Sequence, residues 1–149
     1  MNHNYISLDI PVSFTTAKLL VDVNYPPTLA TDFYMDDGLI INDAFHDSYR
    51  SVGLSMFAAP TFGTLQRWLR IQHNLYVSMA TRQEWDYMND LTTVIHVVMV
   101  SDWNRIISTH DGTGLQLPMH WHAEGDDYDT IYAEGLVIAV RELKRSQKD

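Results

Sequence analysis

The segment Thr92–Val100 constrains the fold most, because its residues are almost all β-branched and too few to span a membrane. β-branched side chains favour extended backbone, so the segment predicts a buried strand. The stretch Trp103–Ser108 is predicted as its antiparallel partner. A strand buried on both faces needs further strands beside it and a layer of helices over it.

Two amphipathic segments can supply that layer. Residues 61–72 start with a threonine that can cap a helix, and their apolar stripe includes Trp68. Residues 129–145 begin among acidic and end among basic side chains, as the helix macrodipole favours, and Leu136 lies on their apolar face. The sequence therefore predicts one α+β domain over residues 1–149. Its mostly antiparallel sheet of four to six strands would carry two or three helices on one face.

Caps and turns mark several boundaries. Ser13 is a candidate N-cap for an early helix. The Asp37-Gly38 step predicts a hairpin, since glycine tolerates the positive φ of tight turns. Asn74 predicts a helix end that leads into a strand, because asparagine accepts the left-handed conformation. Residues 42–58 predict an irregular excursion.

Charge and cysteine content exclude several function classes. The 149 residues carry a net charge of -9, which disfavours direct binding to nucleic acid or anionic lipid and favours a basic protein partner. With no cysteine, disulfides, zinc–thiolate sites and thiol nucleophiles are excluded. No apolar run approaches the ~18 residues of a membrane span, and the N-terminus has no secretion signal. We therefore expect a cytoplasmic protein without membrane association.

Three segments in order also suggest a family. They contain a Pro-Thr helix start, a Trp-Leu-Arg helix, a His-Asn exit into a strand, and a closing helix. The segments are Val12–Leu20, Ala59–Val77 and Tyr132–Leu136. In this order the chain resembles a family of small uncharacterised proteins found in Bacteroidetes genomes and their phages and integrated elements. The resemblance implies a shared fold and a phage or mobile-element origin, and it implies no reaction, ligand or catalytic residue.

The pattern His120-Trp121-His122 is the most suggestive candidate site. Residues two apart on a strand project to the same side, so the two imidazoles can face one divalent transition metal ion, with Asp126 or Asp127 as the acidic ligand. The alternative is an exposed or edge strand with Trp121 turned inward, which is the alternation of a half-buried strand. The second interpretation is favoured, because the motif stands without its usual structural context.

Other histidines have structural interpretations. His96 lies in the apolar strand and is predicted as a core histidine with a hydrogen-bond partner. His73 is predicted to cap its helix or to pack against Trp68. The pair His110-Asp111 suggests an acid–base pair, but its glycine-rich surroundings favour a turn.

The sequence therefore predicts no catalytic or cofactor-binding residue. We expect an accessory protein of a phage or mobile element that binds an unknown protein, basic in character, or forms a homo-oligomer. One alternative is a small metal-binding protein or metal-dependent enzyme that uses His120, His122 and Asp126. Another is an acidic decoy that occupies a nucleic-acid-binding protein by mimicking phosphate charge.

Overall fold

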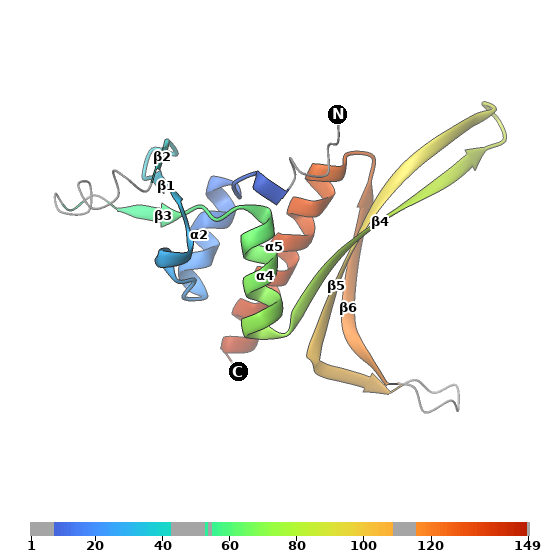
Figure 1. Ribbon diagram of the computed structural model, residues 1–149. Coiled ribbons are helices and arrows are strands. Elements are labelled where there is room, and N and C mark those ends of the chain that lie inside the picture. Colours follow the sequence, from blue (N-terminus) through green and yellow to red (C-terminus); the bar gives the residue numbers. More distant parts are fainter. Residues whose placement is uncertain (1–7, 43–52, 54, 109–115, 149) are drawn as a thin grey trace. The chain divides into compact units, whose positions relative to one another are not determined.

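The computed structural model describes residues 8–42, 53, 55–108 and 116–148, which form an α+β fold, as predicted (Figure 1). Among these residues, six strands lie in two three-stranded antiparallel sheets. None of the helices they form is both long and apolar enough to cross a lipid bilayer. The elements in chain order are α2 Phe14–Asp22, the 3₁₀ helix η1 Pro27–Leu29, β1 Asp32–Met35, β2 Ile40–Asn42, β3 Met56–Ala58, α4 Phe62–His73, β4 Leu75–Asp86, β5 Leu91–Ser108, β6 Gln116–Gly125 and α5 Tyr128–Gln147.

The chain divides into two compact units. The first unit comprises Met1–Arg67 and Val140–Asp149, and the second comprises Trp68–Ala139. The divisions fall inside α4 and α5, so each unit takes one end of both helices. Each unit also contributes fully buried apolar side chains, such as Leu20 in the first and Val98 in the second.

In the first unit, α2 begins where the sequence predicts. The side chain of Ser13 accepts a hydrogen bond from the backbone amide of Thr16 at 3.2 Å, which satisfies one of the free amides of the first turn. Ala17 and Leu20 lie on the buried side of the helix. The predicted N-cap is therefore confirmed.

The sheet of the first unit has the order β2-β1-β3. The β1–β2 hairpin turns at Gly38, whose φ of 84° lies in the left-handed region. The Asp37 side chain accepts a hydrogen bond from the backbone amide of Leu39 at 3.0 Å and so supports the turn. The predicted hairpin is confirmed. Most of the excursion predicted at 42–58 lies outside the described residues, and its end forms β3.

Helix α4 is bounded by the two predicted caps. The hydroxyl of Thr61 accepts from the backbone amide of Thr64 at 3.3 Å. At the other end Asn74 has a φ of 56° and donates its amide to the carbonyl of Arg70, which closes the helix and turns the chain into β4. Trp68, on the predicted apolar stripe, is only 7% exposed.

The sheet of the second unit has the order β4-β5-β6, with both neighbours of β5 antiparallel to it. Val77 on β4 and both Val98 and Val100 on β5 are buried. The strand predicted at Thr92–Val100 is present as part of β5, but of its nine residues only Val98 and Val100 are buried, and Thr92–Val94 and Met99 are exposed, so the prediction of a buried strand holds only at its end.

The predicted partner strand at Trp103–Ser108 is wrong, because these residues continue β5. The chain does not turn at the polar stretch; the pairing with β6 shifts register between Asp102 and Ile106 instead. Asp102, only 3% exposed, accepts hydrogen bonds from the backbone amide of Asn104 at 3.0 Å and from Nε of Arg105 at 2.9 Å. These bonds satisfy the polar groups of Asp102, Asn104 and Arg105 within the strand, although a polar sequence of this kind is more typical of a turn.

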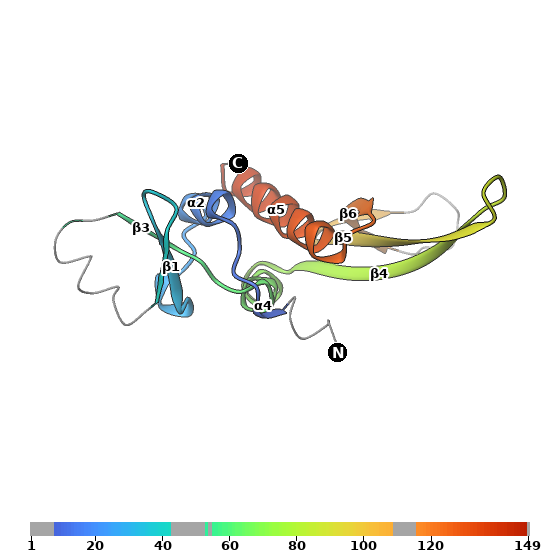
Figure 2. The ribbon, with the colours of Figure 1, turned by 90° about the horizontal axis from the view of Figure 1, so that it is seen from above.

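Helix α5 starts at an aspartate cap. The carboxylate of Asp127 accepts from the side-chain hydroxyl and the backbone amide of Thr130, and these bonds lower the pKa of Asp127. The first half of α5 lies along one side of the β4-β5-β6 sheet (Figures 1 and 2). There Gly135 packs against Val98, and Leu136 is buried, as its predicted apolar face requires.

Candidate functional site

Strands β4 and β5 form a hairpin that extends past the end of β6 (Figure 1). Strand β6 pairs with β5 only as far as His96, which faces Gly125, whereas β4 and β5 remain paired up to Asp86 and Leu91. Residues 82–95 therefore form a two-stranded ribbon, which we call the arm. A two-stranded hairpin has little apolar surface of its own to bury, so it is marginally stable alone.

The tip of the arm has a defined turn. The carboxylate of Asp86 accepts from the backbone amide of Met88 at 3.0 Å and from the side-chain amide of Asn89 at 2.7 Å. These bonds, with the one from Asn89 foremost, lower the pKa of Asp86. Asp90 closes the turn with a φ of 53°. The turn leaves the side chains of Tyr87 and Met88 facing water.

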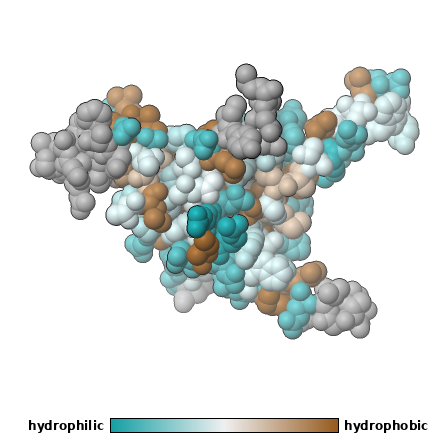
Figure 3. Space-filling model, viewed as in Figure 1, coloured by the Kyte–Doolittle hydropathy of each residue, from teal (hydrophilic) through white to brown (hydrophobic). Residues whose placement is uncertain are grey.

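Five large apolar side chains of the arm are exposed, most of them at or near its tip. Tyr87 and Met88 at its tip are 87% and 92% exposed. The Trp85 ring makes an edge contact with Tyr87, with 6.3 Å between centroids, and is itself about half exposed. Leu91 and Val94 on the returning strand are exposed as well. Figure 3 shows apolar surface at the far end of the arm. Clustered exposed aromatics of this kind are typical of protein-binding surfaces.

An ion-pair triad fixes the base of the arm. Nη1 of Arg82 lies 2.8 Å from a carboxylate oxygen of Glu124 on β6, and its Nη2 lies 2.8 Å from one of Glu84 on β4. The hydrogen bonds to Glu124 and then Glu84 raise the pKa of Arg82, so its guanidinium stays charged. All three side chains are exposed, so the triad sets positions more than it adds stability.

The predicted metal residues lie on and beside β6, an edge strand of the sheet. His120 and His122 are exposed on one side of the strand, and Trp121 between them is half-buried. The alternation predicted for a half-buried strand is therefore present. Nδ1 of His120 lies 3.3 Å from the carbonyl oxygen of Pro118. Asp126 follows the strand and does not join the two imidazoles, and the described residues contain no group of three acidic or histidine side chains that could hold a metal ion.

The other histidines have separate structural partners. Nδ1 of His96 lies 3.0 Å from the hydroxyl of Thr81, and its ring makes an edge contact with Tyr128 at the start of α5. The ring of His73 packs on Trp68, with 4.4 Å between centroids, and burial lowers the pKa of His73. His73 packs on Trp68 as predicted, whereas His96 has the predicted hydrogen-bond partner but is half-buried and does not lie in the core. The predicted pair at 110–111 lies outside the described residues.

A shallow hollow beside the end of α4 was not found from the sequence. It has a volume of about 500 Å³ and is lined by Asn74, Tyr76 and Trp103. The two aromatic rings meet edge to face, with 6.5 Å between centroids, and both are about two-fifths exposed. Its lining consists of one amide and two aromatic side chains.

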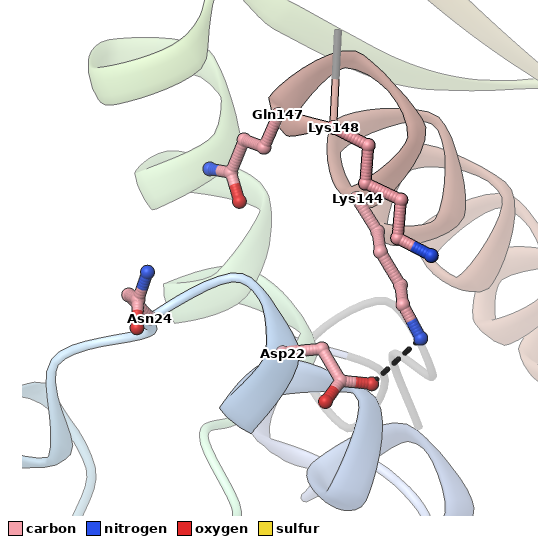
Figure 4. A pocket seen from close by; sticks show the side chains of 5 residues that line it. All are labelled: Asp22, Asn24, Lys144, Gln147 and Lys148. Atoms are coloured by element: carbon pink, nitrogen blue, oxygen red, sulfur yellow. Dashed lines mark hydrogen bonds and ion pairs between the residues drawn. The ribbon is translucent and has the colours of Figure 1, made fainter.

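A second hollow lies in the first unit and is polar (Figure 4). Its volume is about 540 Å³, and its lining includes Lys144, Lys148 and Asp22. Nζ of Lys144 lies 2.8 Å from the Asp22 carboxylate, so that cation already has its counter-ion. Lys144 also lies in the last turn of α5, where the macrodipole favours positive charge. These features explain the lysine structurally and do not indicate an anion site.

Comparisons with protein-family models, with curated proteins and with solved structures found no match. The resemblance to small proteins of Bacteroidetes and their phages stays a prediction. The arm is the feature that the sequence analysis did not predict. The signal that could have found it is Asn89-Asp90, a turn-forming pair between two β-rich segments.

Proposed function

We propose that the protein acts by binding another protein and that the arm is its contacting element. The observation that carries this proposal is the exposure of Trp85, Tyr87 and Met88 on a ribbon that extends beyond the third strand. Aromatic and methionine side chains contribute most to binding when a partner removes them from water. A function in a phage or mobile element, as an accessory protein without catalysis, is part of the same proposal.

The geometry of the arm suits this role better than it suits chemistry. The turn bonds of Asp86 define the conformation of the tip, and the Arg82 triad joins the base of the arm to β6. The carboxylate of Asp86 serves the turn, and Glu84 belongs to the triad but stays exposed, so the exposed apolar side chains are the largest contacts that the arm offers a partner.

Site-specific photo-crosslinking tests the proposal. A photoreactive phenylalanine analogue at Tyr87 is expected to give a discrete protein adduct in the native host, whereas the same analogue at Leu29, exposed in the first unit, gives none. The adduct protein is then purified and its binding measured directly. Trp85→Ala and Met88→Ser are each expected to weaken that binding by about tenfold or more, and Leu29→Ser to leave it unchanged.

Two results would count against a protein-binding arm. One is that position 87 gives no adduct at all, neither with another protein nor with a second copy of the chain. The other is binding that survives both arm substitutions. Metal analysis addresses the alternative: a stoichiometric transition metal lost in the His120→Ala/His122→Ala variant would favour the metal-dependent function.

A further inference from the structure

Strand β4 presents an open edge. It lies at the end of the sheet order β4-β5-β6, so among the described strands only β5 pairs with it. Along its 12 residues, alternate backbone amides and carbonyls point away from β5. Proteins usually protect so long an edge with lysine, proline or a bulge. The edge of β4 has no lysine or proline, and the charges of its arm portion are Arg82, Glu84 and Asp86, whose signs decide which strand can pair with it.

The charges on this edge are complementary to themselves. In an antiparallel pairing of two β4 strands centred on Gln83, Arg82 of each copy lies directly opposite Glu84 of the other. The two-fold axis repeats the pair, so one register brings two opposite-charge pairs together, beside the Arg82–Glu84 and Arg82–Glu124 pairs that each chain already has. A register centred on Glu84 would instead place the two Glu84 carboxylates against each other, which is unfavourable.

From this complementarity we infer that the partner of the arm is a second copy of the chain, joined to the first through β4 in the register centred on Gln83. The inference rests on the proposed function and specifies its partner. The pairing joins two three-stranded sheets through residues 80–86 of both β4 strands and covers the open edge of each strand over that stretch.

The same register covers exposed side chains of the arm. Trp85 lies opposite Thr81 of the second copy, an aromatic and β-branched pair that favours strand association. Tyr87, just beyond the strand end, comes beside Met79 of the second copy, which is half-buried in the body of the sheet. The dimer thus pairs backbone groups and buries apolar arm surface at once.

Charge reversal tests the register in the full chain. Light scattering with size-exclusion chromatography over a concentration series is expected to show a dimer for the unmodified chain. Arg82→Glu and Glu84→Arg each place like charges opposite each other and are expected to weaken the dimer by about tenfold or more. The double variant restores opposite charges and dimerises again. An equimolar mixture of the two single variants forms a heterodimer.

Glu124→Gln is the matched control. It removes the partner of Arg82 on β6 without touching the β4 edge, so the dimer is expected to persist. Thermal unfolding followed by circular dichroism shows whether each variant remains folded.

A cysteine cross-link tests the axis even where a charge variant unfolds. The chain has no cysteine, so Gln83→Cys introduces a single thiol. At the two-fold axis the two Cα atoms would lie about 4.5–5.5 Å apart, within disulfide range. Oxidation by dissolved oxygen is expected to link the two copies. Gln72→Cys, exposed near the end of α4, gives no such dimer at the same protein concentration.

Three results would overturn the inference: a monomer at every concentration, a dimer insensitive to both charge reversals, or no preferential cross-link at position 83. If the chain is a monomer and a different protein is captured at Tyr87, the inference that the partner is a second copy is overturned, but the proposal of a protein-binding arm is still supported. Loss of both self-association and arm adducts would defeat the two proposals together.

Discussion

Gly135 of α5 and Val98 of β5 pack so closely that no methyl group fits between them. The Cβ atom of an alanine at position 135 would overlap Cγ2 of Val98 and would lie 3.1 Å from its Cβ. Val98 is fully buried and its branched side chain has little freedom to move aside. A glycine is therefore required in the middle of a helix, where it is otherwise unfavourable.

Gly135→Ala is expected to destabilise the protein by up to about 2 kcal/mol. The gain in helix propensity is about 1 kcal/mol, and overpacking a core costs about 1–3 kcal/mol, so the clash decides the sign. Urea unfolding measures the change. Glu134→Ala, at the exposed neighbouring position, is the control and should change stability little. Val98→Ala added to Gly135→Ala should cost less than the sum of the two single changes, and strict additivity would contradict the clash.

Ser13→Ala is expected to lower stability by about 1 kcal/mol, because it removes the side chain that accepts from the Thr16 amide. Ser13→Asp, which keeps an acceptor, should retain most of that stability. Thr15→Ala, exposed on the first turn, serves as the control for lost hydroxyl groups. Equal effects of Ser13→Ala and Ser13→Asp in chemical unfolding would show that the cap contributes nothing.

Asp102→Ala is expected to cost about 1–3 kcal/mol, because it leaves the Asn104 amide and the Arg105 guanidinium without their buried acceptor. Arg105 also lies over the ring of Trp121, 5.4 Å from its centroid, so indole fluorescence should report the change. Asp86→Asn, at the exposed tip of the arm, should have a smaller effect. A wild-type unfolding curve for Asp102→Ala would contradict a structural role for the carboxylate at the bulge.

The stability of the second unit is expected to fall as the pH falls through the titration range of His73. Burial lowers the pKa of His73 below its ordinary value of 6.5, so the unfolded chain takes up a proton at a higher pH than the folded one does. The stabilisation is therefore complete above pH 6.5 and decreases below it, toward the folded pKa. His73→Phe keeps a ring against Trp68 and should remove this part of the pH dependence. An NMR titration midpoint at or above 6.5 for His73 would contradict the prediction.

The elements that could be predicted from the sequence are those with local causes. Ser13 and Thr61 each accept a hydrogen bond from the backbone amide three residues later in the chain. Asn74 has a left-handed backbone conformation, which asparagine tolerates. Each of these residues therefore lies within one turn of the helix end that it predicts. The extended conformation of the strand through Val98 followed from its β-branched side chains in the same way.

The features that were missed depend on residues far apart in the sequence. No local pattern shows that β5 continues through Asp102, since the bulge depends on its pairing with β6. The exposure of Trp85 depends on where β6 stops, and the same alternation of side chains would suit a covered strand equally well. At the candidate site, the sequence predicted the alternation of His120 and His122, but not the arm.

The sheet has two strands in the arm and three strands beyond His96, and this difference affects how the backbone opens. Between the tip and His96, opening the ribbon breaks one row of backbone hydrogen bonds, whereas beyond His96 it must break two. Amide protons should therefore exchange with solvent fastest near Leu91 and progressively more slowly toward Val98 and Val100. Fraying that starts at the free end stops where the third strand begins, so the arm can loosen without unzipping the sheet that supports it.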